Sequence, residues 1–206
     1  MGTLIEHGVA ARTLSGERIS GDRALVKPFA HGVLAAAIDG LGHGEAAAAA
    51  AELAAATLEL HAEDDPVVLV ERCHQMLKGT RGVAMSLASI EASDGIMTWL
   101  GVGNVDGRLL RIFGTPPSRE TLSTRGGVVG YQLPPLRAYR LTLSAGDLLI
   151  FTTDGINSGY GKQFLAADPL LRHQPVQEIA DRILARFGKT TDDAVVLVIR
   201  YLGSAP

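Results

Sequence analysis

The chain has 206 residues, of which 47% are hydrophobic and 20% charged, and its formal net charge at pH 7 is −3. This length and apolar content predict one independently folding domain over residues 1–206. A mildly acidic chain argues against a nucleic-acid partner, and no apolar run approaches the about 20 residues that a membrane-spanning helix needs.

Nine apolar or alternating runs predict β-strands. In chain order they are Leu4–Arg12, Ala24–Phe29, Val33–Ile38, Val83–Glu91, Met97–Val102, Leu109–Phe113, Arg137–Leu143, Leu148–Thr152 and Ala194–Tyr201. The passage Gly114–Pro135 is rich in Gly and Pro and predicts a long irregular loop within the domain.

Three helices are predicted, over Glu45–Leu60, Pro66–Leu77 and Pro175–Phe187. Two of them begin at a proline, whose fixed φ suits the first turn of a helix. The alanines of Glu45–Leu60 have small side chains and would allow close packing on a neighbour, and helical propensity alone also favours them. Strands in consecutive runs and helices in isolated blocks predict an α+β fold with mostly antiparallel sheets.

Aspartates stand at the ends of three predicted strands. Val33–Ile38 runs directly into Asp39, Leu148–Thr152 leads through Thr153 to Asp154, and Asp192 and Asp193 precede Ala194–Tyr201. If the last strand is antiparallel to the other two, all these carboxylates gather at one edge. Neighbouring strands are about 4.8 Å apart, which suits the roughly 3.5–4 Å between the ions of two-metal hydrolases.

A carboxylate cluster without counter-ions repels itself, and divalent cations would remove that conflict. Because no set of His or Cys accompanies the aspartates, the pattern favours Mg²⁺ or Mn²⁺ over zinc and does not choose between the two. Taken singly, Asp39-Gly40 and Asp154-Gly155 are common turn dipeptides, and Ser20-Gly21-Asp22 is a typical turn cluster. Their occurrence together is what favours a metal site.

The glycine-rich segment after Asp39 predicts unusual backbone conformations between a strand and a helix. A backbone carbonyl there, such as that of Gly40, would be free to face a metal ion. His43 is flanked by glycines and is either a proton donor to a leaving group or a bystander in the loop.

The single cysteine, Cys73, cannot form an internal disulfide, and Glu6 and His7 interrupt the N-terminus before an apolar secretory segment develops. Both features predict a cytoplasmic protein. Because Cys73 lies in a helical pattern, we interpret it as a packing residue that catalysis does not need.

Four motifs in order resemble those of the metal-dependent PPM-type protein phosphatases, particularly their bacterial SpoIIE-like branch. They are Ser20-Gly21-Asp22, Asp39-Gly40-Leu41-Gly42-His43-Gly44, Thr153-Asp154-Gly155 and Asp192-Asp193-Ala194. The resemblance implies a four-layer αββα sandwich, with the metal site at one end of its two packed sheets. It also implies two divalent cations that activate a water molecule against a phosphoserine or phosphothreonine ester.

The same resemblance assigns roles to individual residues. Asp39 would bridge both ions, Gly40 would offer its carbonyl, and Asp154 and Asp192 would bind one ion, which makes the three aspartates the catalytic residues. Asp22 would complete the shell of the second ion, and Asp193 is a further candidate. Implied substrates are phosphorylated STAS-domain proteins of a stressosome or a similar partner-switching complex.

Two departures from the family pattern and two alternatives stand beside this interpretation. No arginine aligns clearly with the phosphate-gripping arginine of eukaryotic relatives, although Arg12 and Arg18 lie nearby, and Ile156–Gln174 is too short for their large flap. A dinucleotide-binding turn at Gly40-x-Gly42-x-Gly44 departs from the usual spacing and lacks a parallel βαβ series. The other alternative is a catalytically weak phosphatase fold that binds a phosphorylated partner.

Overall fold

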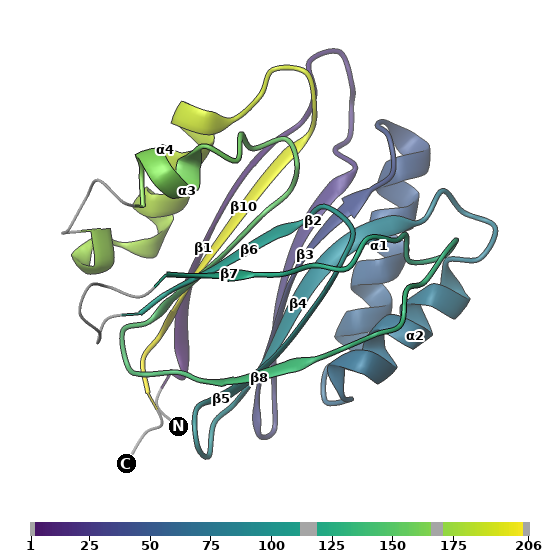
Figure 1. Ribbon diagram of the computed structural model, residues 1–206. Coiled ribbons are helices and arrows are strands. Elements are labelled where there is room, and N and C mark those ends of the chain that lie inside the picture. The colour runs from purple at the N-terminus through teal and green to yellow at the C-terminus, as the bar shows by residue number, and fades with distance from the viewer. Residues whose placement is uncertain (1–2, 112–118, 166–170, 204–206) are drawn as a thin grey trace.

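The computed structural model describes residues 3–111, 119–165 and 171–203, which form two five-stranded sheets between outer helices (Figure 1). Sheet A has the order β1 (Ile5–Arg12), β10 (Ala194–Tyr201), β9 (Leu148–Thr152), β6 (Asp106–Leu110) and β7 (Arg119–Leu122). Sheet B has the order β2 (Asp22–Phe29), β3 (Gly32–Gly40), β4 (Val83–Glu91), β5 (Ile96–Val102) and β8 (Tyr139–Thr142). Each pairing of these strands is antiparallel.

Period-two alternation in the central strands builds three apolar layers. In β3, Val33, Ala35 and Ala37 lie in the core between the sheets, whereas Leu34, Ala36 and Ile38 face the helices that cover sheet B. Strand β10 is likewise apolar on both faces, and its outer face packs against the helices on sheet A. A strand buried on both sides reads as a continuous apolar run, which is why both strands were predictable.

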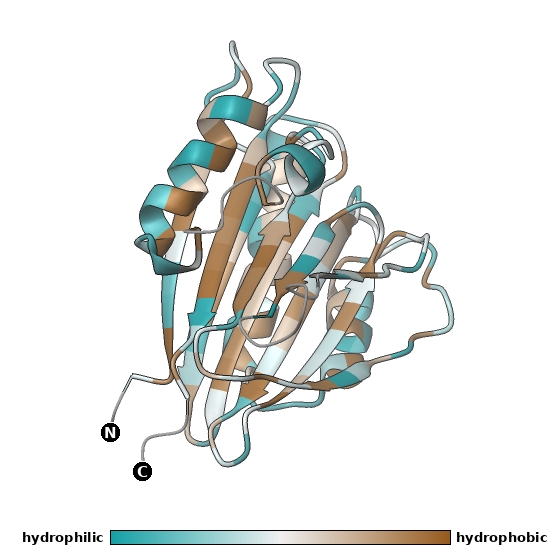
Figure 2. Ribbon diagram, turned by 60° about the vertical axis from the view of Figure 1, so that its left-hand side comes forward, coloured by the Kyte–Doolittle hydropathy of each residue, from teal (hydrophilic) through white to brown (hydrophobic). Residues whose placement is uncertain are grey.

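Helices α1 (Glu45–Leu60) and α2 (Pro66–Met76) cover sheet B, and α4 (Val176–Phe187) crosses sheet A beside the short α3 (Tyr160–Gln163). Figure 2 shows brown strands through the middle of the molecule and teal on the outward side of α4. Helix α2 begins as expected, with Pro66 in its first turn and the Asp65 side chain accepting a hydrogen bond from the backbone N–H of Val67. No helix of the described residues is long and apolar enough to cross a membrane.

The predicted α+β sandwich of antiparallel sheets is confirmed, with differences at single elements. The run predicted as a strand at Leu109–Phe113 is instead β6, Asp106–Leu110, and residues 112 and 113 lie outside the described residues. Strand β7, helix α3 and a 3₁₀ turn at Leu171–His173 were not predicted. Because the described ladders are antiparallel, the dinucleotide-binding alternative lacks the parallel sheet that it requires.

Helix α4 lies directly on the edge strand of sheet A. The Gln177 side chain accepts a hydrogen bond from the backbone N–H of Val9 at 3.0 Å and donates one to the carbonyl of Val9 at 2.8 Å. These bonds occupy backbone groups of β1 that an unprotected edge would offer to another chain. At Gly8 the helix is so close that a Cβ atom would lie 2.6 Å from the Cα atom of Gln177.

We therefore expect Gly8→Ala to lower the free energy of unfolding by roughly 1–3 kcal/mol, because the added methyl group forces α4 away from β1. Gly126→Ala is the matched control, since a Cβ atom there would meet nothing within 4 Å. Urea denaturation of both variants measures the difference. Equal midpoints for Gly8→Ala and Gly126→Ala would contradict this packing.

Candidate functional site

Asp22 and Asp39 face each other on neighbouring strands at one end of sheet B. The register of β2 and β3 pairs Asp22 directly with Asp39, at the end opposite the Phe29–Gly32 hairpin. Such cross-strand partners have Cβ atoms about 4.5–5.5 Å apart. Asp22 is only 6% exposed, and its Oδ2 atom is buried without a hydrogen-bond partner in the described residues.

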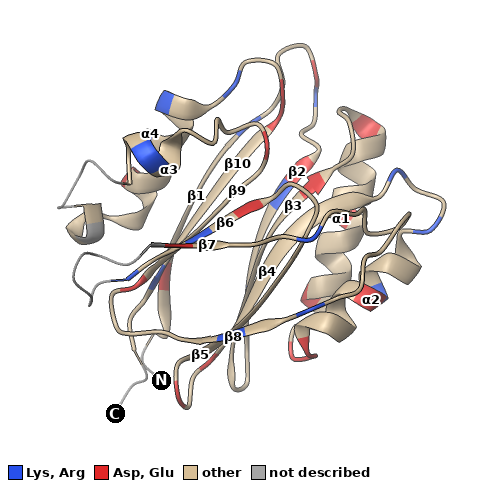
Figure 3. Cartoon of the chain, viewed as in Figure 1, with Lys and Arg blue, Asp and Glu red and all other residues tan. Residues whose placement is uncertain are grey.

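Sheet A brings three more aspartates to the same end. Asp154 follows β9, whereas Asp192 and Asp193 precede β10, and the two strands are antiparallel, as the sequence argument required. A Cβ atom at Gly155 would lie 1.8 Å from the backbone oxygen of Asp193, so only glycine permits this approach of the two loops. Figure 3 shows acidic segments, in red, on the loops and strand ends at this upper end of the sheets.

The Asp193 side chain links the two sheets. Its Oδ1 atom accepts a hydrogen bond from the backbone N–H of Leu14, and its Oδ2 atom accepts one from the backbone N–H of Gly21, both at 2.8 Å. The carbonyl of Gly21 in turn accepts the N–H of Gly40 at 3.0 Å. Both oxygens of Asp193 thus accept a backbone N–H, and the bond from Gly21 fixes the residue that directly precedes Asp22.

Burial and mutual repulsion favour the neutral forms of the two opposed carboxyls. Burial, followed by the charges of Asp22, Asp154, Asp192 and Asp193, raises the pKa of Asp39 to about 8. Burial also raises the pKa of Asp22 to about 7; the Thr153 hydroxyl opposes this rise and the neighbouring aspartates add to it. A nearby cation would reverse both shifts, because it stabilises the ionised carboxylates.

Asp154 and Asp192 are more open and are oriented by their neighbours. The side-chain amide of Asn104 donates a hydrogen bond to Asp154 Oδ2 at 2.7 Å, and Lys189 Nζ donates one to the Asp154 carbonyl at 2.5 Å. Asp192 Oδ1 accepts the backbone N–H of Asp193 at 2.9 Å. Burial and the charge of Asp192 raise the pKa of Asp154, whereas Lys189 and Asn104 oppose this rise.

The described residues offer no ready-made set of three Asp, Glu, His or Cys side chains to hold a metal ion. This does not exclude Mg²⁺ or Mn²⁺, because Mg²⁺ commonly keeps several waters and uses only one or two carboxylates. Two observations fit such ions: the unpartnered buried oxygen of Asp22 and the raised pKa of Asp39. The carbonyl of Gly40 as a ligand stays a prediction.

The other candidate residues have defined surroundings. His43 is 61% exposed, and its Nδ1 atom lies 2.6 Å from Glu17 Oε1 in the loop between β1 and β2. The Arg12 guanidinium donates a hydrogen bond to the backbone carbonyl of Lys189, whereas Arg18 is exposed. Cys73 is fully buried in α2, and burial raises the pKa of its thiol to about 12, as suits a packing residue.

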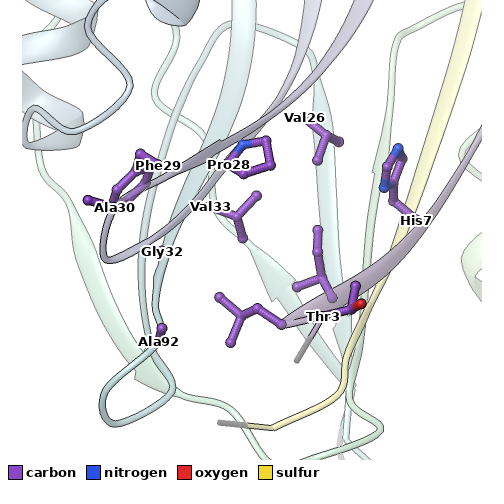
Figure 4. Close-up of a pocket in the computed structure, with 11 residues that line it drawn as sticks. Thr3, His7, Val26, Pro28, Phe29, Ala30, Gly32, Val33 and Ala92 are labelled. Atoms are coloured by element: carbon purple, nitrogen blue, oxygen red, sulfur yellow. The ribbon is translucent and has the colours of Figure 1, made fainter. Parts of the chain in front are cut away.

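Two cavities lie at opposite ends of the sandwich. One, of about 300 Å³, adjoins Asp154, and its lining includes the polar side chains of Asn104, Asn157 and Lys189. The other, of about 470 Å³, lies between β1 and the β2–β3 hairpin (Figure 4). Its lining is mainly apolar, with polar side chains from Thr3 and His7, and it lacks the carboxylates of the first end.

Sequence reasoning missed three residues at the acidic end. Asn104, Glu17 and Lys189 reach Asp154 or His43 from irregular loops distant in the chain. In the sequence, Asn104 is marked only by following a strand, Glu17 by lying in a turn and Lys189 by following a helix. Many surface residues share such positions.

Comparisons with known proteins agree with this fold. Residues 30–202 match the sequence profile of the family described as Stage II sporulation protein E (SpoIIE). Phosphoserine phosphatase RsbX of Bacillus subtilis (strain 168) is 26% identical over 185 residues, which are 89% of this chain and 88% of that protein.

Solved structures agree as well. A chain described with the words "The bacterial stressosome: a modular system that has been adapted to control secondary messenger signaling" aligns with a TM-score of 0.84. Its sequence is 32% identical, and the alignment covers 95% of this chain and 99% of that one. RsbX in complex with magnesium aligns with a TM-score of 0.80 at 24% identity, over 96% of this chain and 95% of that one.

The paired antiparallel sheets and the matched structures define a protein phosphatase of the PPM type, also called PP2C. Within that class, the chain belongs to the SpoIIE family. The resemblance to PPM-type phosphatases, and to their SpoIIE-like branch in particular, is thereby confirmed.

The raised pKa values of Asp22 and Asp39 predict how stability depends on pH without divalent ions. In the unfolded chain these carboxyls ionise near pH 3.8, whereas in the folded protein they do so only near pH 7 to 8. Between these limits the folded state binds more protons, so stability should fall as pH rises from about 4 to about 8.

We expect Asp39→Asn, measured in EDTA, to lose less stability than the wild type as the pH rises. At pH 8 its free energy of unfolding should exceed that of the wild type by at least about 1 kcal/mol, or roughly 2–4 °C in Tm. The reason is that the amide carries no charge into the cluster. Thermal unfolding across the pH range tests this, with the exposed turn substitution Asp94→Asn as control. A wild-type curve that rises towards pH 8 would contradict the proposed repulsion.

Asp193 and Asp192 should differ in what their loss does to stability. Asp193→Ala leaves the N–H groups of Leu14 and Gly21 without their acceptor, which costs about 1–3 kcal/mol for each group that stays buried. Asp192→Ala removes only one local bond to the next residue and should change stability by less than about 1 kcal/mol. Urea denaturation compares the pair, and equal losses would refute the linking role of Asp193.

Proposed function

We propose that this protein is a metal-dependent serine/threonine phosphatase that uses two divalent cations, Mg²⁺ or Mn²⁺. The observation that carries the proposal is the gathering of aspartates from both sheets at one end of the sandwich. Burial, and after it the charges of four other aspartates, raises the pKa of Asp39; these aspartates come from β2 and from the loops beside β9 and β10. Such a cluster is costly unless cations compensate it.

Asp39, Asp22, Asp154 and Asp192 would hold the ions, with the carbonyl of Gly40 as a further ligand. Ions bound there lower the pKa of water and offset the negative charge of the phosphoryl oxygens. The protein's own contribution is orientation: Asp193 fixes the start of β2, and Asn104 fixes the carboxylate of Asp154.

The cavity beside Asp154 gives room for a phosphorylated side chain, since its volume is about 300 Å³ and its lining includes the polar side chains of Asn104, Asn157 and Lys189. In the loop after Asp39, Nδ1 of His43 forms a hydrogen bond with Glu17. This leaves Nε2 of His43 to donate a proton to the leaving oxygen. His43 is thus the proposed general acid, oriented by Glu17.

For the substrate we propose phosphoserine or phosphothreonine on STAS-domain proteins of a stressosome-type, partner-switching complex. Support comes from the relatives: RsbX is named a phosphoserine phosphatase, and the structure that aligns at 32% identity is described as part of work on the bacterial stressosome. Incubation with phosphorylated STAS-domain proteins, followed by mass spectrometry of the phosphosite, tests this. Retention of the phosphate alongside hydrolysis of small esters would reject the substrate and keep the enzyme.

A catalytically weak binding module is the second candidate. Such a module would bind the phosphorylated partner with Mn²⁺ present, yet leave its phosphate in place over hours.

In steady-state assays with para-nitrophenyl phosphate and Mn²⁺, we expect hydrolysis that EDTA abolishes. Asp39→Asn and Asp154→Asn should each lower kcat/KM at least about 100-fold, because each removes a charge that holds the ions. Cys73→Ala is the control: it should keep kcat near the wild-type value, since the thiol is buried away from the site. Activity that survives both EDTA and Asp39→Asn would eliminate the metal-dependent mechanism.

A further inference from the structure

Most cations around the acidic end already have protein acceptors. Arg12 donates to the backbone carbonyl of Lys189, and Lys189 donates to the carbonyl of Asp154. Arg23, beside Asp22, forms an ion pair with Glu52 at 3.1 Å. Each of these side chains would have to give up an acceptor before it could bind a phosphate dianion.

Arg81 differs from them in both its bonding and its position. It lies two residues before β4 and is exposed, and its guanidinium makes no hydrogen bond or ion pair within the described residues. The guanidinium nevertheless has a defined place against the glycine-rich loop that follows Asp39. Its Nη1 atom lies 2.7 Å from the position that a Cβ atom of Gly42 would occupy.

The backbone beside Arg81 is fixed relative to that loop. Thr80 Oγ1 donates to the carbonyl of Leu77 at 2.7 Å and accepts the N–H of Gly82 at 3.0 Å. The carbonyl of Gly82 accepts the N–H of Leu41 at 3.1 Å. The neighbour of Arg81, Gly82, is therefore bonded directly to Leu41, which follows Asp39 and Gly40. The Arg81 side chain lies against Gly42 of the same segment.

We propose that Arg81 binds the phosphoryl group of the substrate. This inference rests on the proposed phosphatase function and names the residue that recognises the substrate at the same site. A guanidinium presents a planar fork of N–H donors that matches two phosphate oxygens, and the N–H groups of Arg81 have no acceptor among the described residues. A side chain at position 42 would displace this guanidinium, because its Cβ atom alone would lie 2.7 Å from Nη1.

Arg18 is the competing residue. It too is exposed and makes no side-chain hydrogen bond or ion pair within the described part of the chain, and it follows Glu17, the partner of His43. At the glycines of the loop after Asp39, the nearest side chain is that of Arg81 at Gly42 and that of Glu17 at Gly44, and not that of Arg18. Arg81 is thus better placed than Arg18 to bind a phosphoryl group beside this loop, and a variant of each residue is needed to distinguish them.

The test compares Arg81→Ala, Arg81→Lys, Arg18→Ala and Arg72→Ala in the full chain with Mn²⁺. Arg72 pairs with Asp64 on the outer surface of α2 and is the control for loss of a surface arginine. The measurements are KM and kcat for para-nitrophenyl phosphate, the inhibition constant of inorganic phosphate, and calorimetric dissociation constants for inorganic phosphate and for Mn²⁺.

We expect Arg81→Ala to weaken phosphate binding about tenfold or more, with KM affected more than kcat and the affinity for Mn²⁺ unchanged. Arg81→Lys should recover part of the loss, because it restores the charge without the fork. Arg18→Ala and Arg72→Ala should stay within about twofold of the wild type.

Unchanged phosphate binding in Arg81→Ala, or the loss appearing in Arg18→Ala instead, would overturn the assignment. The calorimetric measurement separates this from failure of the proposed function. A wild type that binds phosphate through Arg81 but does not hydrolyse esters would refute the enzyme and support Arg81. Metal-dependent hydrolysis with no role for Arg81 would do the reverse.

Discussion

The two hydrogen bonds that Asp193 accepts from Leu14 and Gly21 are the constraint on which the acidic end depends. Asp193 directly precedes β10 of sheet A, whereas Gly21 directly precedes β2 of sheet B. A buried carboxylate that accepts two backbone N–H groups forms charge-assisted bonds, which are stronger than neutral ones. Two backbone hydrogen bonds extend this link, one from the N–H of Gly40 to the carbonyl of Gly21 and one from the N–H of Leu41 to the carbonyl of Gly82. Together they align the ends of β2, β3 and β4 with the loops of sheet A.

Small residues make this alignment sterically feasible. A Cβ atom at Gly40 would lie 2.3 Å from the backbone oxygen of Ala47, so α1 packs on the end of β3 without an intervening side chain. The alanines of α1 that were predicted to allow close packing do so here, and Gly155 serves the same purpose against Asp193. The glycines after Asp39 and Asp154 therefore have a steric cause, beyond the turn preference that the sequence alone conveys.

The predictable parts of the molecule are those with dense local signals. Strands β3 and β10 are continuous apolar runs, and Asp39 and Asp192 lie at their ends, so both the strands and the aspartates could be read from the sequence. Strand β7 was missed because Arg119–Leu122 is four residues long with three polar side chains, and its pairing with β6 supplies the order that propensity does not. Asn104 and Glu17 act through contacts between distant loops, which no local pattern encodes.

The same carboxylates connect stability with chemistry. Burial and crowding raise the pKa values of Asp22 and Asp39, so the acidic end weakens the fold whenever those groups must ionise without a cation. The three apolar cores have no part in this conflict and supply the stability that offsets it. A divalent ion that binds only the folded state stabilises it in proportion to the logarithm of its concentration above the dissociation constant. Ion binding at this end should consequently have two effects at once: it should raise the resistance to unfolding, and it should complete the site. Both effects depend on neutralising the same few negative charges.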